Sequence, residues 1–250
     1  MLALITGASS GLGRDFARNL SRMGYDIIAV AQDLEKLNSL KEELKTNVQV
    51  ISMDLSIRQN VIDLYEQVKS KDIDIVINNA GFGVFGEFDN TDLNKELNMI
   101  DVNVCAVHIL TKLFLKDFKE KNKGYILNIA SSAAFEPGPL MASYYASKAY
   151  VLRLTQAIYE ELRRDKSNVY IGALCPGPVD TNFNNVAGVR FTVKSLKSED
   201  VVRYALNKMF KRKLVIVPGI MMKFTRIVVR LLPDKLVARI AYNIQKSKKK

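Results

Sequence analysis

The segment Thr6-Gly7-Ala8-Ser9-Ser10-Gly11-Leu12-Gly13 decides the fold of this chain of 250 residues. It follows a short apolar run, Leu2–Thr6, and precedes a stretch of helical periodicity, Gly13–Met23. Glycine permits a tight turn there, and its missing Cβ lets an anionic group approach the backbone. The N–H groups at the start of the following helix favour such an anion. A glycine-rich turn between a strand and a helix therefore predicts a pyrophosphate-binding loop.

Outward from this loop, short apolar runs alternate with longer stretches of helical period. This alternation is typical of βαβ units, whose parallel strands are covered by helices on both faces. The length suits one domain. We therefore predict an α/β fold with a Rossmann-type doubly wound parallel sheet of seven strands in a single domain, 1–250. The expected strands are Leu2–Thr6, Asp26–Ala31, Val48–Met53, Ile73–Asn78, Gly124–Ala130, Val169–Cys175 and Leu214–Val217, and the expected helices include Gly13–Met23, Leu34–Leu44, Ile57–Lys69, Leu93–Lys121 and Tyr144–Arg164.

The composition is that of a globular protein, with 48% hydrophobic and 25% charged residues. Cys105 and Cys175 are too few for a disulfide framework and lack a metal-binding spacing, so we expect two buried thiols and no metal site. The N-terminus lacks the features of a signal peptide. The sequence contains no run of about 18 uncharged apolar residues, so we do not expect a membrane-spanning helix. The expected compartment is the cytoplasm.

Positive charge is concentrated at the end of the chain. The net charge is +11, and residues 203–250 contain 14 basic residues and a single acid, Asp234. The favoured interpretation of the basic, apolar extension 219–250 is an amphipathic helical segment that closes the fold, followed by a solvated tail from Lys246 to Lys250. The alternative is a weak contact with an anionic membrane surface through 222–250. Nucleic-acid binding is not expected, because no recognised module accompanies the charge.

A tyrosine and a lysine at helical spacing indicate acid–base chemistry. Tyr144 and Lys148 are i, i+4 neighbours, so their side chains share one side of a helix. An ammonium group near a phenol lowers the phenol's pKa, which would suit Tyr144 to general acid catalysis. Tyr145 lies three residues before Lys148, and helical spacing alone leaves it open as the acid. Ser131 directly follows an expected strand, where side chains face the ligand crevice of a parallel sheet.

These motifs, in this order, resemble the short-chain dehydrogenase/reductase family from Met1 to about Phe183, and the C-terminal region resembles its DltE-like carbonyl reductase branch. The family's Tyr-x-x-x-Lys pattern, with a serine 13 residues before the tyrosine, selects Tyr144 over Tyr145. The resemblance implies an oxidoreductase that transfers a hydride between a nicotinamide cofactor and a carbonyl or alcohol. It also implies a fourth catalytic residue, Asn103.

The resemblance further implies which residues form the site. The implied catalytic residues are Ser131, Tyr144, Lys148 and Asn103. The implied cofactor-binding residues are Gly7, Ser9, Ser10, Gly11, Leu12, Gly13, Gln32, Asp54, Leu55, Asn79, Ala80, Gly81, Tyr144, Lys148, Pro176, Gly177, Val179 and Thr181.

The end of the second expected strand bears on the choice between NAD and NADP. Ala31 stands where NAD-preferring relatives carry aspartate, and Gln32 stands where many NADP-preferring relatives carry arginine. Asp33 would either repel a phosphate or cap the next helix, and Arg14 is near in sequence to the loop. Because the aspartate is missing, we predict that NADP(H) is favoured over NAD(H).

Apolar residues near the motifs predict an apolar substrate: a ketone, an aldehyde, a hydroxysteroid-like or a 3-oxoacyl compound. Segment 182–196 is the expected substrate lid. The alternative function is a catalytically silent dinucleotide-binding scaffold or sensor. The resemblance also implies a homodimer or homotetramer, and the basic C-terminus favours a dimer. The expected pocket residues are Phe82, Phe85, Phe135, Leu140 and Met141.

Overall fold

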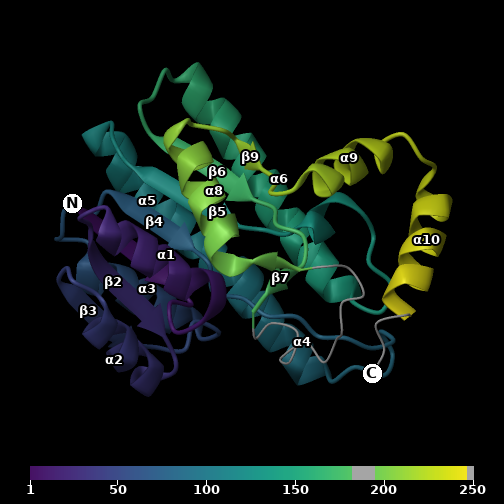
Figure 1. Ribbon diagram of the computed structural model, residues 1–250, viewed down its shortest axis with the longest axis horizontal. Helices are drawn as coiled ribbons and strands as arrows, with labels where there is room; N and C mark the ends of the chain where they lie inside the picture. Colours follow the sequence, from purple (N-terminus) through teal and green to yellow (C-terminus); the bar gives the residue numbers. More distant parts are fainter. Residues whose placement is uncertain (182–194, 247–250) are drawn as a thin grey trace.

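The computed structural model describes residues 1–181 and 195–246, which form the predicted α/β fold (Figure 1). Seven parallel strands make one sheet in the order β3-β2-β1-β4-β5-β6-β9. All seven predicted strands are present: Leu2–Thr6 and Asp26–Ala31 have the predicted bounds, and the bounds of the other five differ by one or two residues. The strands are β1 (Leu2–Thr6), β2 (Asp26–Ala31), β3 (Val48–Ser52), β4 (Ile75–Asn78), β5 (Tyr125–Ile129), β6 (Tyr170–Leu174) and β9 (Val215–Ile216).

Helices cover both faces of the sheet because successive strand residues point to opposite sides. In β1, Ala3 and Ile5 pack under one set of helices and Leu4 packs under the other. One face carries α1 (Gly11–Arg22), α2 (Leu34–Glu43) and α8 (Ser198–Phe210), and the opposite face carries α3 (Arg58–Val68), α5 (Val107–Lys121) and α6 (Ala142–Arg164).

The strand order places the ligand crevice. After β1 the chain moves to β2 and β3 on one side, then returns to β4 on the other side of β1. The connections that leave β1 and β4 therefore run in opposite directions, and a crevice opens between them at the carboxyl ends of the strands. The glycine loop follows β1, and the Asn-Asn-Ala-Gly segment, 78–81, ends β4.

The predicted helix Leu93–Lys121 is divided in the structure. A π-helical segment, Asp101–Ala106, separates α4 (Leu93–Ile100) from α5. By length and composition alone, the continuous stretch could cross a membrane, and 44% of its most apolar window is buried within the protein. Its buried residues, such as Phe114 and Phe118, belong to the core beneath the sheet. We therefore assign this helix to the core.

The chain ends in an arm. Two short strands, β7 (Val179–Asp180) and β8 (Leu196–Lys197), pair in parallel and precede α8. After β9 come α9 (Ile220–Val228) and α10 (Asp234–Lys246), drawn in yellow on the side of the molecule opposite α2 and β3 (Figure 1). We call residues 219–246 the C-terminal arm. Of the expected lid, 182–196, all but its last two residues lie outside the described part of the chain.

The prediction of two buried thiols is half correct. Cys175 is fully buried at the end of β6, and burial raises its pKa to about 12. Cys105 is only partly buried, because it lies on the outer side of the π-helical segment near Arg58 and Asp101. Within the described residues no cluster of His, Cys, Asp or Glu has the arrangement of a metal site.

Candidate active site

A cavity of about 620 Å³ lies at the carboxyl ends of the strands. Its floor is the glycine loop and the ends of β4, β5 and β6, and its outer wall is the C-terminal arm. Most residues that the resemblance implied line this cavity. They are Gly7, Ser9, Ser10, Gly11, Leu12, Asn79, Ala80, Gly81, Ser131, Tyr144, Lys148, Pro176, Gly177, Val179 and Thr181.

Glycine is required at three positions of the loop. Gly7 and Gly11 have φ values of +65° and +52°, the left-handed region that other residues rarely adopt. A Cβ on Gly13 would lie 2.1 Å from the carbonyl oxygen of Gly7. The first turn of α1 is therefore pressed against the loop. Ser10, at the N-cap of α1, makes no side-chain capping bond, so its side chain leaves the helix's first N–H groups uncapped.

The Asn-Asn-Ala-Gly segment is tied to the loop by hydrogen bonds. The Asn79 side-chain amide donates to the carbonyl oxygens of Thr6 at 2.9 Å and Gly7 at 3.2 Å. The Thr6 hydroxyl oxygen accepts from the backbone N–H groups of Asn79 and Ala80. These bonds keep β1 and β4 together at the crevice, so Asn79 positions the loop as well as lining the cavity.

Four implied cofactor residues do not line the main cavity, and one of them, Gly13, is packed against the Gly7 carbonyl group as described above. Gln32 and Asp54 line a neighbouring hollow together with Ser52, Met53 and Asn60. Leu55 is buried and does not line either space. The Asp54 carboxylate accepts from the backbone N–H and the hydroxyl of Ser56, at 2.9 and 2.8 Å. This hollow lies at the carboxyl ends of β2 and β3.

Ser131, Tyr144 and Lys148 come together at the base of the cavity. Tyr144 and Lys148 are buried on α6, and the Lys148 Nζ lies 5.9 Å from the centre of the Tyr144 ring. The Lys148 Nζ donates to the carbonyl oxygen of Ile129 at 2.9 Å. Ser131 follows β5 and its side chain is hydrogen-bonded to Tyr144. Two hydroxyl groups and an ammonium group therefore lie together at the base of the cavity. We call this cluster of Ser131, Tyr144 and Lys148 the corner.

The expected lowering of the Tyr144 pKa is wrong for this structure. Burial raises the pKa of Tyr144 to about 12, and the hydrogen bond from Ser131 offsets only part of that rise. Burial also lowers the pKa of Lys148 to about 8. The reason is desolvation: the corner is enclosed, and an enclosed site disfavours both the phenolate and the ammonium. Tyr144 is therefore protonated at neutral pH.

The structure separates the two tyrosines that helical spacing left open. Tyr145 also lines the cavity, and its hydroxyl is hydrogen-bonded to the side-chain amide of Gln245 on α10. Gln245 is buried although it lies one hundred residues further along the chain. Burial and the charge of Glu136 raise the pKa of Tyr145. Tyr145 therefore supports the C-terminal arm, and the bond with Ser131 is made by Tyr144.

Asn103 lies behind the cavity and does not line it. Its side-chain oxygen accepts from the N–H of Phe82 at 3.1 Å, and its amide donates to the Phe82 carbonyl at 2.9 Å and the Ser147 hydroxyl at 3.1 Å. It is fully buried within the π-helical segment. Asn103 is thus a positioning residue that links α6 to the segment after β4, and it lies within the π-helical segment.

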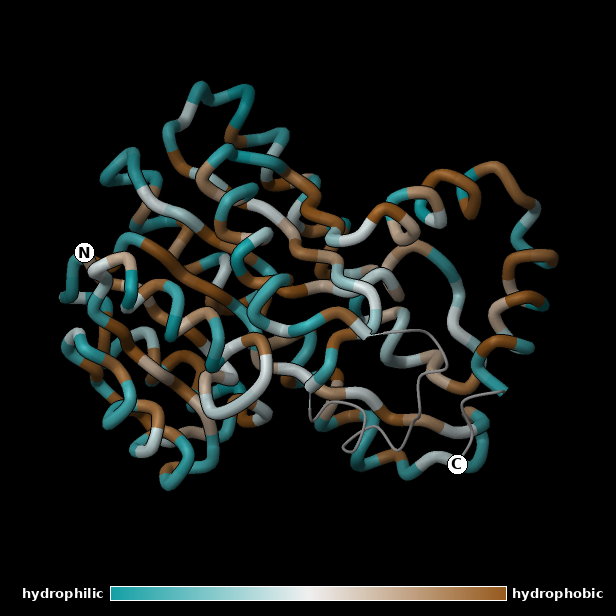
Figure 2. The backbone as a smooth tube through the Cα atoms, in the orientation of Figure 1, coloured by the Kyte–Doolittle hydropathy of each residue, from teal (hydrophilic) through white to brown (hydrophobic). Residues whose placement is uncertain are grey.

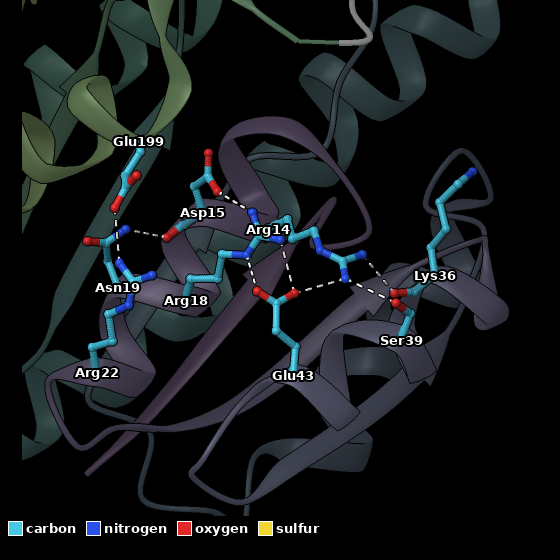
Figure 3. Close-up of polar contacts among 9 residues, drawn as sticks. All are labelled: Arg14, Asp15, Arg18, Asn19, Arg22, Lys36, Ser39, Glu43 and Glu199. Atoms are coloured by element: carbon cyan, nitrogen blue, oxygen red, sulfur yellow. Dashed lines mark hydrogen bonds and ion pairs between the residues drawn. The ribbon is translucent and has the colours of Figure 1, made fainter.

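The residues that bear on cofactor choice are shown in part in Figure 3. The Arg14 guanidinium turns toward α2, where it contacts Glu43 at 3.0 Å and Ser39 at 3.1 Å. Asp33 caps α2 by accepting from the N–H of Lys36 at 3.0 Å, and it also pairs with the Lys36 ammonium. The Asp33 carboxylate therefore caps α2 and is paired with the ammonium group of Lys36, close to the end of β2.

Sequence reasoning missed the apolar outer wall of the cavity. Phe82, Phe135 and Met141 line it as expected, while Phe85 and Leu140 do not. Ten further apolar lining residues come from the C-terminal arm, which sequence periodicity identified as amphipathic without indicating what it covers. Those residues are Met221, Met222, Phe224, Val228, Val229, Leu232, Val237, Ile240, Ala241 and Ile244.

A buried polar network beneath the corner was also missed. Asn78 donates to the side chains of Asn128 at 2.8 Å and Thr111 at 3.1 Å, and Asn128 donates to Thr155 at 3.0 Å. These residues join β4, β5, α5 and α6. Buried polar groups that satisfy one another fix a unique arrangement. The network therefore holds the helix that carries Tyr144 against the sheet.

The family model of short chain dehydrogenases matches residues 1–188. An uncharacterized oxidoreductase of Staphylococcus epidermidis is 32% identical over 211 residues, which cover 83% of this chain and 91% of that protein. Mouse 17-beta-hydroxysteroid dehydrogenase type 3 is 33% identical over 197 residues, which cover 76% of this chain and 64% of that protein. The match to the family model spans all four residues that the resemblance implied as catalytic.

Solved structures agree with the fold. A short-chain dehydrogenase from Sphingobium yanoikuyae in complex with NADPH has a TM-score of 0.82 and 30% identity, covering 88% of each chain. A short chain dehydrogenase/reductase from Burkholderia phymatum in complex with NAD has a TM-score of 0.83 and 26% identity, covering 92% of each chain. The similar proteins therefore include structures with either nicotinamide dinucleotide bound.

Proposed function

Because the chain belongs to the short-chain dehydrogenase family and is an oxidoreductase that uses a nicotinamide cofactor, we propose that it reduces apolar ketones or aldehydes with NADPH. A single observation carries the proposal: a cavity with apolar walls ends where Ser131 lies beside the buried side chains of Tyr144 and Lys148. A silent scaffold would not need a lysine and a tyrosine buried together at the base of a cavity, because burying such groups is costly.

The residues present fit a nicotinamide dinucleotide. The glycine loop has no Cβ where a pyrophosphate would approach, and the uncapped start of α1 supplies N–H groups for it. Gln32 and Asp54 would hold the adenosine end, and Val179 and Thr181 would hold the nicotinamide end. When bound, the reduced cofactor supplies the hydride.

The chain's own residues would handle the proton. The Ser131 hydroxyl would donate to the substrate's carbonyl oxygen and hold it beside Tyr144. Tyr144 would then give its phenolic proton to that oxygen as negative charge develops there. The Lys148 ammonium, held by the Ile129 carbonyl, stabilises the phenolate that remains. Tyr144 is protonated at neutral pH, so the resting enzyme is prepared for reduction.

The pH dependence of reduction follows from these two groups. Lys148 has a pKa of about 8, so its ammonium is lost as pH rises through that value, while Tyr144, near 12, stays protonated. We expect kcat/KM for reduction to be level below about pH 7 and to fall about tenfold per pH unit well above 8. A steady-state profile on a soluble ketone measures this. A profile that rises through pH 8 would contradict the assignment, and Tyr145→Phe, the control, should keep the wild-type profile.

The apolar walls predict substrate preference. Residues such as Phe135, Met141 and Val229 offer no charged partner to a phosphate or carboxylate substrate. We expect kcat/KM to rise with apolar size among ketones and aldehydes, by about fourfold for each added buried CH₂, equivalent to about 0.8 kcal/mol. A screen of alkyl and aromatic ketones with NADPH measures this trend. No turnover of any carbonyl despite tight cofactor binding would favour the scaffold interpretation.

The preference for NADPH rests on the end of β2. No carboxylate stands at Ala31, and Asp33 is neutralised by Lys36. We expect NADPH to bind more tightly than NADH in separate fluorescence titrations. Ala31→Asp would put a carboxylate against the 2′-phosphate and should weaken NADPH binding about 10- to 100-fold while sparing NADH, because like charges in contact cost a few kcal/mol. Ala31→Ser is the matched control. Equal effects on the two cofactors would disprove this assignment.

A further inference from the structure

The C-terminal arm exposes a large apolar surface. Ile220 is 85% exposed and Leu231 is 79% exposed. Along α9 the exposed apolar residues recur at three- and four-residue intervals, so they share one side of the helix. In Figure 2 the arm's backbone is largely brown, with teal segments between. The exposed apolar residues are Ile220, Met221, Phe224, Ile227 and Leu231 in and after α9, and Leu236, Ile240, Tyr242 and Ile244 in α10.

The C-terminal arm is also positively charged, and two of its cations, Lys223 and Arg226, lie over the rings of Tyr204 and Phe135. In the described part of the chain, none of the arm's basic residues forms an ion pair with a carboxylate, although the body has many ion pairs. Asp234 is the arm's one acid. The basic residues are Lys223, Arg226, Arg230, Lys235, Arg239 and Lys246. A surface that combines apolar side chains with unneutralised cations matches an interface between anionic headgroups and acyl chains.

The apolar surface is continuous with the cavity. Met221, Phe224, Ile240 and Ile244 are each between 44% and 67% exposed, and all four also line the cavity. The exposed apolar residues of the arm thus include part of the cavity wall. The cavity wall and the exposed apolar residues are therefore carried by the same two helices, α9 and α10.

We propose that the C-terminal arm docks on an anionic lipid bilayer and that the cavity takes its apolar substrate from the acyl layer. Exposed large apolar side chains at this density are rarely left facing water. A second copy is disfavoured as the occupant, because a two-fold contact would bring the six cations of each arm together. Binding of the arm to a bilayer does not depend on the proposed reaction. Entry of the substrate from the acyl layer into the cavity does rest on the proposed function.

Vesicle cosedimentation of the full chain tests the docking. We expect binding to vesicles of phosphatidylcholine mixed with phosphatidylserine, weak binding to phosphatidylcholine alone, and release by salt. Arg230→Glu with Lys235→Glu and Arg239→Glu should reduce the affinity at least about 100-fold, since each basic residue near the surface contributes about a factor of five. Equal binding to the two vesicle types would overturn the proposal.

A variant that keeps the arm's charge distinguishes insertion of apolar side chains into the bilayer from electrostatic attraction to its headgroups. Ile220, Ile227 and Leu231 are exposed and do not line the cavity. Replacing all three by serine should abolish vesicle binding and leave NADPH affinity and turnover of a soluble ketone unchanged. The matched control replaces three exposed apolar residues of the body, Ile57→Ser, Ile62→Ser and Leu93→Ser, and should bind vesicles like the wild type.

Two further outcomes would count against the docking. If light scattering shows a dimer that the three serine substitutions dissociate, a second copy covers the arm and the proposal is wrong. If those substitutions leave vesicle binding intact, the apolar surface does not enter the bilayer. Failure of turnover on every carbonyl, with vesicle binding intact, would count against the proposed reaction alone, because cosedimentation does not depend on activity.

Discussion

Replacing Tyr144 by phenylalanine is expected to lower kcat for ketone reduction by about 100- to 10,000-fold, the usual contribution of a positioned general acid. The substitution removes the hydroxyl that Ser131 contacts and keeps the ring that packs against Met99 and Met141. The protein should therefore remain folded and bind NADPH with nearly unchanged affinity. Single-turnover kinetics, with a fluorescence titration of the cofactor, measures the two effects separately.

Tyr145→Phe is the matched control for this experiment. Its ring lies 6.1 Å from that of Tyr144, so the two substitutions remove equivalent atoms from neighbouring sites. The lost hydrogen bond to Gln245 should cost about 1 kcal/mol of stability and change turnover several-fold at most. If Tyr145→Phe abolishes turnover and Tyr144→Phe does not, the assignment of the acid is wrong.

Gly13→Ala is expected to damage the cofactor site. The added Cβ would lie 2.1 Å from the Gly7 carbonyl oxygen and 2.5 Å from the Asn79 amide nitrogen. Neither is the end of a flexible side chain free to move, because the Asn79 amide is bonded to Thr6 and Gly7. The loop must shift away from α1, and we expect NADPH affinity to fall at least about 100-fold, since misplaced N–H groups lose several charge-assisted hydrogen bonds.

The same substitution should lower the free energy of unfolding by about 1–3 kcal/mol, the usual cost of overpacking. Gly24→Ala is the control: its φ is +86° and a Cβ there would meet nothing within 4 Å. It should cost about 1–2 kcal/mol through backbone strain alone and leave the affinity for NADPH unchanged. Thermal unfolding with and without NADPH distinguishes the two variants. Unchanged NADPH affinity in Gly13→Ala would contradict the described packing of the loop.

Much of the site could be predicted because its signals are local. The seven strands are short apolar runs with clear boundaries, and the glycine loop stands between one of them and a helix. The spacing of Tyr144 and Lys148 depends only on helical geometry. The π-helical segment at Asn103 was not visible as a break, because Asp101–Ala106 contains no proline or glycine; side-chain bonds to Phe82 and Ser147 accompany the irregularity.

The sequence by itself determined the order of strands and helices, the position of the glycine loop and the identity of the residues that meet at the base of the cavity. Only the tertiary structure decided how those residues behave. Burial by distant segments raises the pKa of Tyr144, and Gln245 engages Tyr145 from the far end of the chain. The C-terminal arm forms the cavity's outer wall because the tertiary fold brings it next to segments that are distant in sequence. Solvation and contact between remote segments depend on packing in three dimensions, which local periodicity does not encode.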